Sequence, residues 1–393
     1  MTTETKVSHS ERPFPITATA ILLILMAIGL VVAIIRYVNG IGAISNLSDG
    51  RAWGLWISLD LYCGVALAAG GFTLAAAVYI FNMKKYYPIV RSAILTAFVG
   101  YVMVIVAILV DLGQPWRIWH IMIYWNPHSP LFEVGWCVLL YTAVLALEFS
   151  PNIFERFDME VPLRWVRAIQ IPLVILGIIL STLHQSSLGS VLLLMPDKIH
   201  PLWFTPILPL LFFLSAVAVG PAMVIVETSL GSKGLGHHVN PEIPTGLGSW
   251  MPYLLGLYLI VRLGDLLAAG EFGLIFTSGI YSVLFLAEIV IGVILPLILF
   301  ALAAVRRSPT ALFWSALLVV VGLVLNRFNV SLVALYPRAG AVYFPHWMEF
   351  AISISIIAAG ILAYILANRY LPIAPHEEYP EEPEPVEPVA QAA

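Results

Sequence analysis

Ionisable side chains inside long apolar stretches are the residues of this 393-residue chain best suited to chemistry. Asp60, Asp111, Glu133 and His184 each lie near an end of such a stretch, and Gln185 follows His184. A charged group at the centre of a bilayer costs on the order of 2.5–3.5 kcal/mol, so a concentration of such groups indicates a function. His184 exchanges protons near neutral pH, and the Gln185 amide can donate to a carbonyl. Together these groups could bind and protonate a small polar head group such as that of a quinone.

We therefore predict a site for quinone binding and proton transfer from these five residues, with Trp53 beside Asp60. The prediction requires that the helices that carry them form one bundle, in which the ionisable groups meet at one depth. Two of the residues also have plainer explanations. Asp111 precedes a Leu-Gly-Gln-Pro turn and could help to satisfy a helix end, and His184 could be a core histidine with satisfied hydrogen bonds.

A second set of ionisable groups could form a proton path through the membrane. Its members are Glu148, Glu227, Arg262, Asp265 and Glu288. Such a path needs water or polar side chains between its members, and the neighbouring stretches offer few, chiefly Ser215, Thr228 and Tyr258. Because most acid and base groups lie in the outer half of the membrane, the sequence favours proton exchange with the outer side.

Structural explanations remain open for this second set. Arg262 and Asp265 are three residues apart and could neutralise each other on one helix face. Arg327 could form a buried ion pair with Glu288 or Glu349. Glu148 and Glu227, which lie nearest the inner helix ends, could simply be solvated carboxylates.

Ten apolar stretches must position these residues. A helix needs about 20 apolar residues to cross a bilayer, and the sequence predicts spans over 16–38, 53–81, 91–111, 131–149, 166–187, 206–228, 250–269, 280–305, 310–329 and 346–369. The chain is 60% hydrophobic and 11% charged, with a mean hydropathy of +0.94. We predict an all-α polytopic membrane protein.

The domain organisation follows from these spans. Residues 1–15 form a polar N-terminus, and residues 16–371 form the ten-helix domain. Within it we predict a first four-helix bundle over 53–187, which holds the quinone site, and a second over 206–330, with spans 1 and 10 peripheral. Residues 372–393 are rich in Pro and Glu and predict a disordered acidic tail.

Lysine and arginine set the orientation. Twelve of the 19 lie in segments on the N-terminal side of the membrane, and four lie in the opposite loops. Because cytoplasmic loops carry the excess of positive charge, both termini are predicted to be cytoplasmic. This orientation fits a multi-pass protein of a bacterial inner membrane.

Composition excludes several functions. A net charge of −4 and a pI near 6.1 give no basic surface for nucleic acid. Cys63 and Cys137 lie inside apolar spans and are expected to be small core residues. Of the nine histidines only His184 is well within a span, so paired axial ligands for a haem are missing, and two separate cysteines cannot hold an iron–sulfur cluster. We expect no metal, haem or cluster in this chain.

The connections on the outer side are long and aromatic. They contain Trp116, Arg117, Trp119, Trp203 and Trp347. Trp and Tyr also gather at membrane interfaces, which explains part of this pattern. Trp and Arg on structured loops are common anchors of protein interfaces as well, so we predict that these residues dock a partner protein.

Several motifs resemble those of a known family. They are Trp53-Gly-Leu-Trp-Ile-Ser-Leu-Asp60, Asp111-Leu-Gly-Gln-Pro115, Phe132-Glu133, Leu183-His-Gln-Ser-Ser187, His200-Pro-Leu-Trp203, Arg262-Leu-Gly-Asp265 and Tyr343-Phe-Pro-His-Trp347. These motifs look like the polysulfide-reductase membrane-subunit family, NrfD and PsrC, and within it the HybB-type subunits of periplasmic uptake nickel–iron hydrogenases. The resemblance covers nearly the whole chain.

The resemblance implies a haem-free membrane subunit of a periplasm-facing respiratory oxidoreductase. Such a subunit anchors a ferredoxin-like iron–sulfur protein, together with the large and small hydrogenase subunits, and passes electrons to or from menaquinone or ubiquinone near the outer face. Relatives of the family also serve molybdenum enzymes and multihaem cytochromes, so these partners are alternatives. A secondary transporter is a further alternative, because transporters also carry repeats and intramembrane charges.

Overall fold

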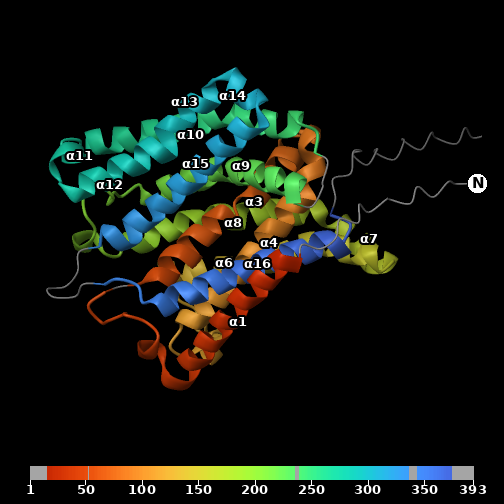
Figure 1. Ribbon diagram of the computed structural model, residues 1–393, viewed down its shortest axis with the longest axis horizontal. Helices are drawn as coiled ribbons and strands as arrows, with labels where there is room; N and C mark the ends of the chain where they lie inside the picture. Colours follow the sequence, from red (N-terminus) through yellow and green to blue (C-terminus); the bar gives the residue numbers. More distant parts are fainter. Residues whose placement is uncertain (1–15, 52, 235–238, 336–342, 374–393) are drawn as a thin grey trace, which may run out of the picture.

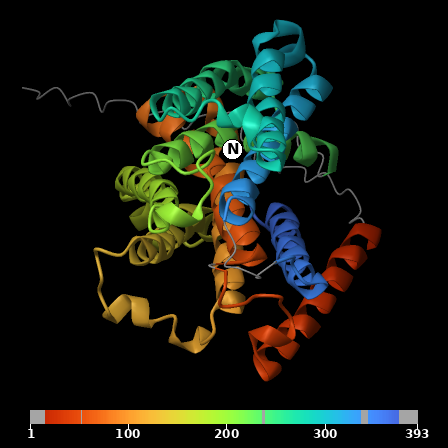
Figure 2. The ribbon, with the colours of Figure 1, turned by 90° about the vertical axis from the view of Figure 1, so that its left-hand side faces the viewer.

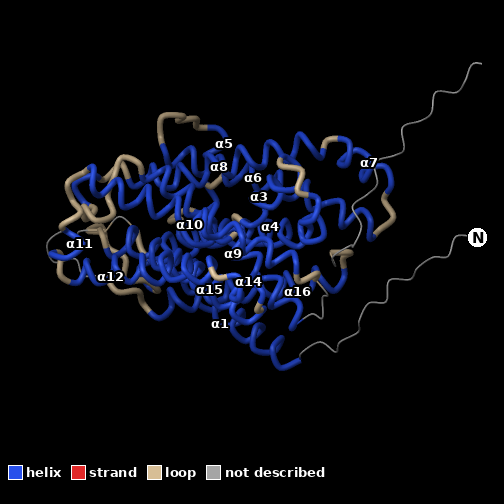
Figure 3. The backbone as a smooth tube through the Cα atoms, turned by 90° about the horizontal axis from the view of Figure 1, so that it is seen from above, coloured by secondary structure: helices blue, strands red, loops and turns tan. Residues whose placement is uncertain are grey.

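Apolar helices account for most of the chain. The computed structural model describes residues 16–51, 53–234, 239–335 and 343–373, and within these ranges it consists of helices and loops without a strand (Figures 1 and 3). Ten of the helices are long and apolar enough to cross a membrane. The predicted all-α fold with ten membrane-spanning helices is therefore confirmed. The predictions for residues 1–15 and for the tail from 374 lie outside the described residues.

Six spans are single helices. They are α1 (Ile16–Asn39), α6 (Pro130–Arg156), α8 (Gln170–Leu192), α9 (Leu208–Gly234), α10 (Glu242–Ala268) and α16 (Trp347–Tyr370). The other four spans are composite. Span 2 consists of η2 (Trp56–Cys63), α2 (Gly64–Leu67), α3 (Gly70–Ala75) and η3 (Ala76–Ile80), and span 3 of η4 (Lys84–Ile89) and α4 (Val90–Asp111). Span 8 consists of α12 (Ile280–Ile289), η7 (Val290–Ile294) and α13 (Leu295–Ala301), and span 9 of α15 (Pro309–Phe328) and η8 (Asn329–Val333).

Several short helices lie in the connections between the spans. They are η1 (Ile41–Ala43), η5 (Pro115–Arg117), α5 (His120–Ile123), α7 (Glu160–Ala168), η6 (Pro196–Lys198), α11 (Leu274–Thr277) and α14 (Ala303–Arg307). The first residue of α1 and the last of α16 lie at the same end of the molecule, on the side of α7 (Figure 1). We call this the inner end, following the predicted orientation, and the opposite end, with α11, the outer end.

Two helix boundaries differ from the sequence prediction in ways that matter for the site. Span 5 was expected over 166–187, but the chain forms the separate helix α7 first, and α8 continues to Leu192. Arg164 and Arg167 explain the break, because charged residues keep α7 at the inner end. His184 therefore lies two turns below the outer end of α8, and not at its end as expected.

Contacts between the spans include two closed rings of four, which we call the first and second helix groups. Span 2, α4, α6 and α8 contact one another in sequence order, and α8 closes on span 2; α9, α10, span 8 and α15 do the same, and α15 closes on α9. The groups meet where α9 packs against α8 and span 2. The view onto the outer end shows α1 (red) at the margin beside α16 (blue), and α16 packs on α4 (Figure 2). Span 8 and α15 approach closely at Gly292 and Gly322, where a Cβ on Gly292 would lie 2.4 Å from the Gly322 Cα.

Four helical segments have π-helical hydrogen bonding: η2, η3, η7 and η8. A π-helical turn inserts an extra residue and reorients the side chains around it, and such turns are frequent at functional sites. Three of the four lie close to buried polar residues. Asp60 is within η2, Glu288 comes just before η7, and Asn329 begins η8.

Candidate functional site

The carboxyl group of Asp60 is buried in the outer half of span 2. Ser353 Oγ on α16 donates a 2.7 Å hydrogen bond to Asp60 Oδ2, and 7% of Asp60 is exposed. Asp111, the last residue of α4, interacts electrostatically with Asp60. Arg36 of α1 attracts Asp111, and its Nε donates to the Val110 carbonyl oxygen over 2.7 Å. Asp60 is therefore hydrogen-bonded to the last spanning helix, and its neighbour Asp111 interacts with the first.

Glu349 adds a third carboxyl group, which interacts electrostatically with Asp111. It is fully buried in the first turn of α16. Tyr343 Oη donates to Glu349 Oε2 over 2.5 Å, and the backbone N–H groups of His346 and Asn46 donate to Oε1 over 2.9 and 3.1 Å. Glu349 thus completes the capping box of its own helix and also interacts with Asp111.

Asp60, Asp111 and Glu349 form what we call the acidic cluster. Asp111 links the other two carboxyl groups and interacts with the Arg36 guanidinium, and linked carboxyl groups of this kind are suited to accept and release protons. Sequence reasoning placed spans 1 and 10 at the periphery and missed Arg36 and Ser353 as site residues. The lone arginine in an otherwise uncharged apolar span was the signal that could have found Arg36.

His184 lies in a different environment. It is fully buried on α8, and its ring centroid is 5.7 Å from that of Tyr101 on α4. The ring approaches the backbone of Val134, in the first turns of α6. Gln185 points to span 2 instead, where its Nε2 donates to the Val65 carbonyl oxygen over 3.0 Å. No hydrogen bond among the described residues joins His184 to the acidic cluster.

The two remaining residues of the predicted site lie further apart. Glu133 is half-buried in the first turn of α6, one residue before Val134. Trp53 precedes span 2 and faces the second helix group: its Nε1 donates to the Ser331 carbonyl oxygen over 3.1 Å, and Tyr62 packs against its ring. The structure thus brings Asp60 to Asp111, places His184 near the backbone of Val134, the residue after Glu133, and leaves Trp53 on the side of span 9.

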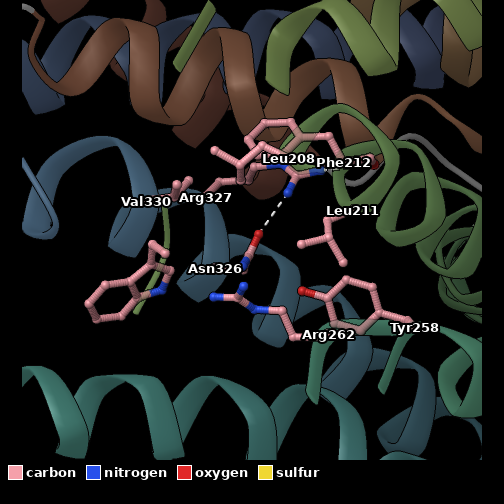
Figure 4. Close-up of a pocket in the computed structure, with 9 residues that line it drawn as sticks. Leu208, Leu211, Phe212, Tyr258, Arg262, Asn326, Arg327 and Val330 are labelled. Carbon is pink, nitrogen blue, oxygen red and sulfur yellow. Dashed lines mark hydrogen bonds between the residues drawn. The ribbon is translucent and has the colours of Figure 1, made fainter. Parts of the chain in front are cut away.

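The second helix group holds a buried hydrogen-bonded network near its outer end. Glu288 is its centre: Oε2 accepts from Trp203 Nε1 over 3.0 Å and from Asn329 Nδ2 over 2.8 Å, and Oε1 accepts from Asn326 Nδ2 over 2.7 Å. Asn326 Oδ1 in turn accepts from Arg327 Nη1 over 2.7 Å. Figure 4 shows Arg262 and Arg327 on either side of Asn326, around a small cavity. The network therefore links the cationic Arg327 of α15 to the anionic Glu288 of α12 through Asn326.

Two structural explanations for these charges can now be judged. Arg262 Nη1 pairs with Asp265 Oδ2 at 3.5 Å, so that explanation is confirmed. The expected ion pair between Arg327 and Glu288 or Glu349 is wrong: among the described residues Arg327 has no carboxylate partner, and it reaches Glu288 only through Asn326. Arg327 also donates to Ser215 Oγ over 2.7 Å. Its Cζ lies 3.8 Å from the Phe212 ring centroid, and an aromatic face at this distance stabilises a guanidinium.

Glu227 is not the solvated carboxylate that one explanation expected, whereas Glu148 is partly exposed. Glu227 is buried between α9, α4 and α16, where Ser92 Oγ and Tyr364 Oη donate to its Oε1, the latter over 3.0 Å. Glu148 lies within the first helix group, near the ring of Tyr141. The five residues of the predicted proton path therefore lie in three separate places, and no described hydrogen bond joins one of these places to another.

Residues 43–336, about three-quarters of the chain, match the model of the family described as Polysulphide reductase, NrfD. The chain belongs to the NrfD family. It is 38% identical over 356 residues to a protein of Escherichia coli named "Probable Ni/Fe-hydrogenase 2 b-type cytochrome subunit", in a match that covers 89% of this chain and 91% of the relative. It is 32% identical over 367 residues to the "Menaquinone reductase, integral membrane subunit" of Nitratidesulfovibrio vulgaris, over 86% and 87% of the two chains. The "Hdr-like menaquinol oxidoreductase integral membrane subunit" of Archaeoglobus fulgidus is 24% identical, over 86% and 74%.

The name of the E. coli relative raises the question of a haem. In a b-type cytochrome, a haem held within a helix bundle needs two facing histidines at one depth. In the described part of this NrfD-family chain, His184 is the only histidine well inside a spanning helix, since His120, His128, His200 and His346 lie in outer connections or at a helix start. No group of three or more His, Cys, Asp and Glu residues there could hold a metal. The described residues do not fit a bis-histidine haem.

The aromatic residues predicted to dock a partner divide into two sets. Trp116 and Trp119 are 66% and 50% exposed on the outer segment that holds η5 and α5, and Arg117 lies between them. In the view onto the outer end, this segment extends sideways beyond the helices (Figure 2). Trp347 is exposed at the start of α16. Trp203 is 1% exposed and donates to Glu288, so its prediction as a surface anchor is wrong.

Proposed function

We propose that this chain is the membrane subunit of a periplasm-facing respiratory oxidoreductase, a nickel–iron hydrogenase complex in a bacterial inner membrane. It anchors a ferredoxin-like iron–sulfur subunit together with the hydrogenase large and small subunits. It passes electrons between that iron–sulfur subunit and menaquinone or ubiquinone near the outer end, with both of its own termini in the cytoplasm. It binds no haem or iron–sulfur cluster of its own.

The observation that carries this proposal is the burial of acid and base groups at the outer end of the first helix group. Quinone reduction consumes two electrons and two protons, so a site needs proton donors beside the quinone oxygens. The acidic cluster and His184 supply such groups, and Gln185 supplies an amide. Similarity to the menaquinone reductase and hydrogenase subunits over nearly nine-tenths of each chain supports the same substrate class and partner.

The exposed outer segment supplies the proposed docking surface. Trp116, Arg117 and Trp119 protrude beside the outer ends of α4 and α6, and Trp347 lies at the same end of the molecule on α16. A partner seated on these residues would place its cluster over the helices that carry Asp111 and Glu133. The identity of the partner distinguishes the hydrogenase complex from a molybdenum or multihaem complex.

The experiment is purification of the tagged chain with its partners from native membranes in mild detergent. Mass spectrometry identifies the partners, and hydrogen-dependent reduction of a soluble menaquinone analogue measures function. Hydrogenase subunits and an iron–sulfur protein, with quinone reduction, are the expected result. A molybdenum or multihaem partner would replace the hydrogenase assignment, and a lone subunit that transports a solute would overturn the proposal. An absorption spectrum with a reduced b-type haem band would contradict the haem-free assignment.

A further inference from the structure

A line of polar side chains runs through the apolar interior of the first helix group. Glu148 and Tyr141 are seven residues apart on α6, and Ser181 and His184 are three residues apart on α8. Tyr101 of α4 contacts one ring on each of these helices. Its ring centroid is 4.7 Å from that of Tyr141 and 5.7 Å from that of His184. We call these five residues the polar file. At 1.5 Å rise per residue, it extends over roughly 15 Å along the helix axes.

Three of the five residues of the file have buried polar atoms without a hydrogen bond among the described residues. The Tyr101 hydroxyl, the Ser181 hydroxyl and both ring nitrogens of His184 have no hydrogen bond within the described residues. The Ser181 hydroxyl interacts with the hydroxyls of both Tyr101 and Tyr141, although it does not reach hydrogen-bond geometry with either. Buried polar atoms in proteins are hydrogen-bonded, and where protein groups do not reach them, ordered water does so.

The inner end of the file is a carboxyl group. Glu148 Oε1 and the Tyr141 ring both lie against Gly177 of α8, where a Cβ would lie 3.4 Å from the carboxyl oxygen and 3.5 Å from Tyr141 Cε2. Glu148 has no ion pair in the described part of the chain. It lies eight residues from the inner end of α6, and His184 lies eight residues from the outer end of α8. The file therefore joins the inner third of the bundle to its outer half.

We infer that the polar file, completed by water, conducts protons from the inner side of the membrane to His184. This inference rests on the proposed function, in which His184 protonates a quinone oxygen. When a quinone takes two electrons from the iron–sulfur partner, His184 gives one proton to the quinone oxygen and is reprotonated along Tyr101, Ser181 and Tyr141 from Glu148. Glu148 then takes a proton from the inner side, and the second quinone proton comes from the acidic cluster.

Hydroxyl groups and water can relay a proton because each both accepts and donates a hydrogen bond. The second helix group is less suited to this task. Its Glu288 already accepts three hydrogen bonds, and its Arg262 is paired with Asp265. The inference differs from the sequence-based expectation of exchange with the outer side alone, since one proton of the two now crosses most of the bilayer.

The test uses the intact complex in liposomes, with quinone reduction and the pH of both compartments followed together. Glu148→Gln and Tyr141→Phe keep the shape of the file but remove a proton acceptor and a hydroxyl. We expect each to lower proton uptake from the inner compartment at least tenfold per quinone reduced. The matched controls are Glu160→Gln on exposed α7 and Tyr253→Phe on the exposed face of α10, which should leave uptake unchanged.

The outcomes separate this inference from the proposed function. If wild-type complex reduces quinone but takes up protons from the outer side alone, the polar file does not conduct. Unchanged inner-side uptake in both file variants would overturn the inference in the same way. If no purified complex reduces quinone with any electron donor, the proposed function itself fails. Tyr141→Phe complexes that retain their partner subunits exclude misfolding as the cause of a lost signal.

Discussion

Ser353 of the last spanning helix donates a 2.7 Å hydrogen bond to Asp60 of the second, across 293 residues of sequence. The bond brings α16 into the acidic cluster, together with Glu349 one turn earlier on the same face. The helix α16, predicted to be peripheral, is thus part of the candidate site. The same holds for α1, whose Arg36 interacts with Asp111. Span 10 cannot be exchanged for an arbitrary apolar helix without loss of these contacts.

Ser353→Ala should weaken quinone turnover several-fold while the complex still assembles. The substitution leaves a buried carboxyl group without its donor, which costs about 1–3 kcal/mol. Hydrogen-dependent quinone reduction and thermal unfolding in detergent measure the two effects. Ser355→Ala is the control, because Ser355 faces α1 and not Asp60. Equal effects of the two substitutions would argue against a role for the Asp60 contact.

His184→Ala should lower quinone-coupled turnover at least tenfold. The imidazole is the proposed proton donor, so its loss slows protonation of the quinone but not the arrival of electrons. Electron transfer from the partner to an artificial acceptor should persist in the same preparation. Unchanged quinone turnover in purified complex would remove His184 from the site.

Asp111→Asn should lower the rate of quinone reduction more than it lowers quinone affinity. Asparagine keeps the shape of the side chain at the end of α4 but cannot accept and release a proton, so KM should hold better than kcat. Steady-state kinetics with a menaquinone analogue give both values. Failure of the complex to assemble would instead show that Asp111 mainly satisfies the end of its helix.

Glu288→Ala should destabilise the second helix group strongly. It leaves the buried donors of Trp203, Asn326 and Asn329 without their common acceptor. Removing one member of a buried charged network costs about 3–5 kcal/mol, so little folded protein should accumulate. Glu288→Gln keeps two lone pairs on its carbonyl oxygen and should fold with a smaller loss of thermal stability. The measurements are yield in membranes and the midpoint of thermal unfolding.

His200 should make the outer connection between α8 and α9 sensitive to acid. Its Nδ1 accepts from the backbone N–H of Leu202 over 3.1 Å, which requires the neutral ring, and burial lowers the pKa of His200 below 6.5. A lowered pKa means that the unfolded chain binds the proton more tightly, so stability is full above about pH 6.5 and falls as the pH falls below it. His200→Asn, whose amide oxygen can accept the same bond, should flatten this loss. Thermal unfolding at pH 5 to 8 compares the two proteins, and identical profiles would contradict the prediction.

The sequence by itself determined the ten spans, their order and the concentration of ionisable groups in the outer halves. These follow from local composition, because a window of about 20 apolar residues is sufficient to specify a membrane helix. It also indicated that Arg262 and Asp265 could pair, because i,i+3 neighbours on one helix face lie close together, and the structure confirms the pair.

Only the tertiary structure decided which helix faces meet. The spans are apolar on nearly all sides, so hydropathy does not indicate which side of a helix faces lipid and which faces a neighbour. Asp60 was expected beside His184 but lies with Asp111, Glu349 and Ser353, and His184 lies with Tyr101. The rotation of each helix is set by contacts with several others at once, and close glycine pairs such as Gly292 and Gly322 fix those contacts. That is information distributed over the whole chain, and no local pattern contains it.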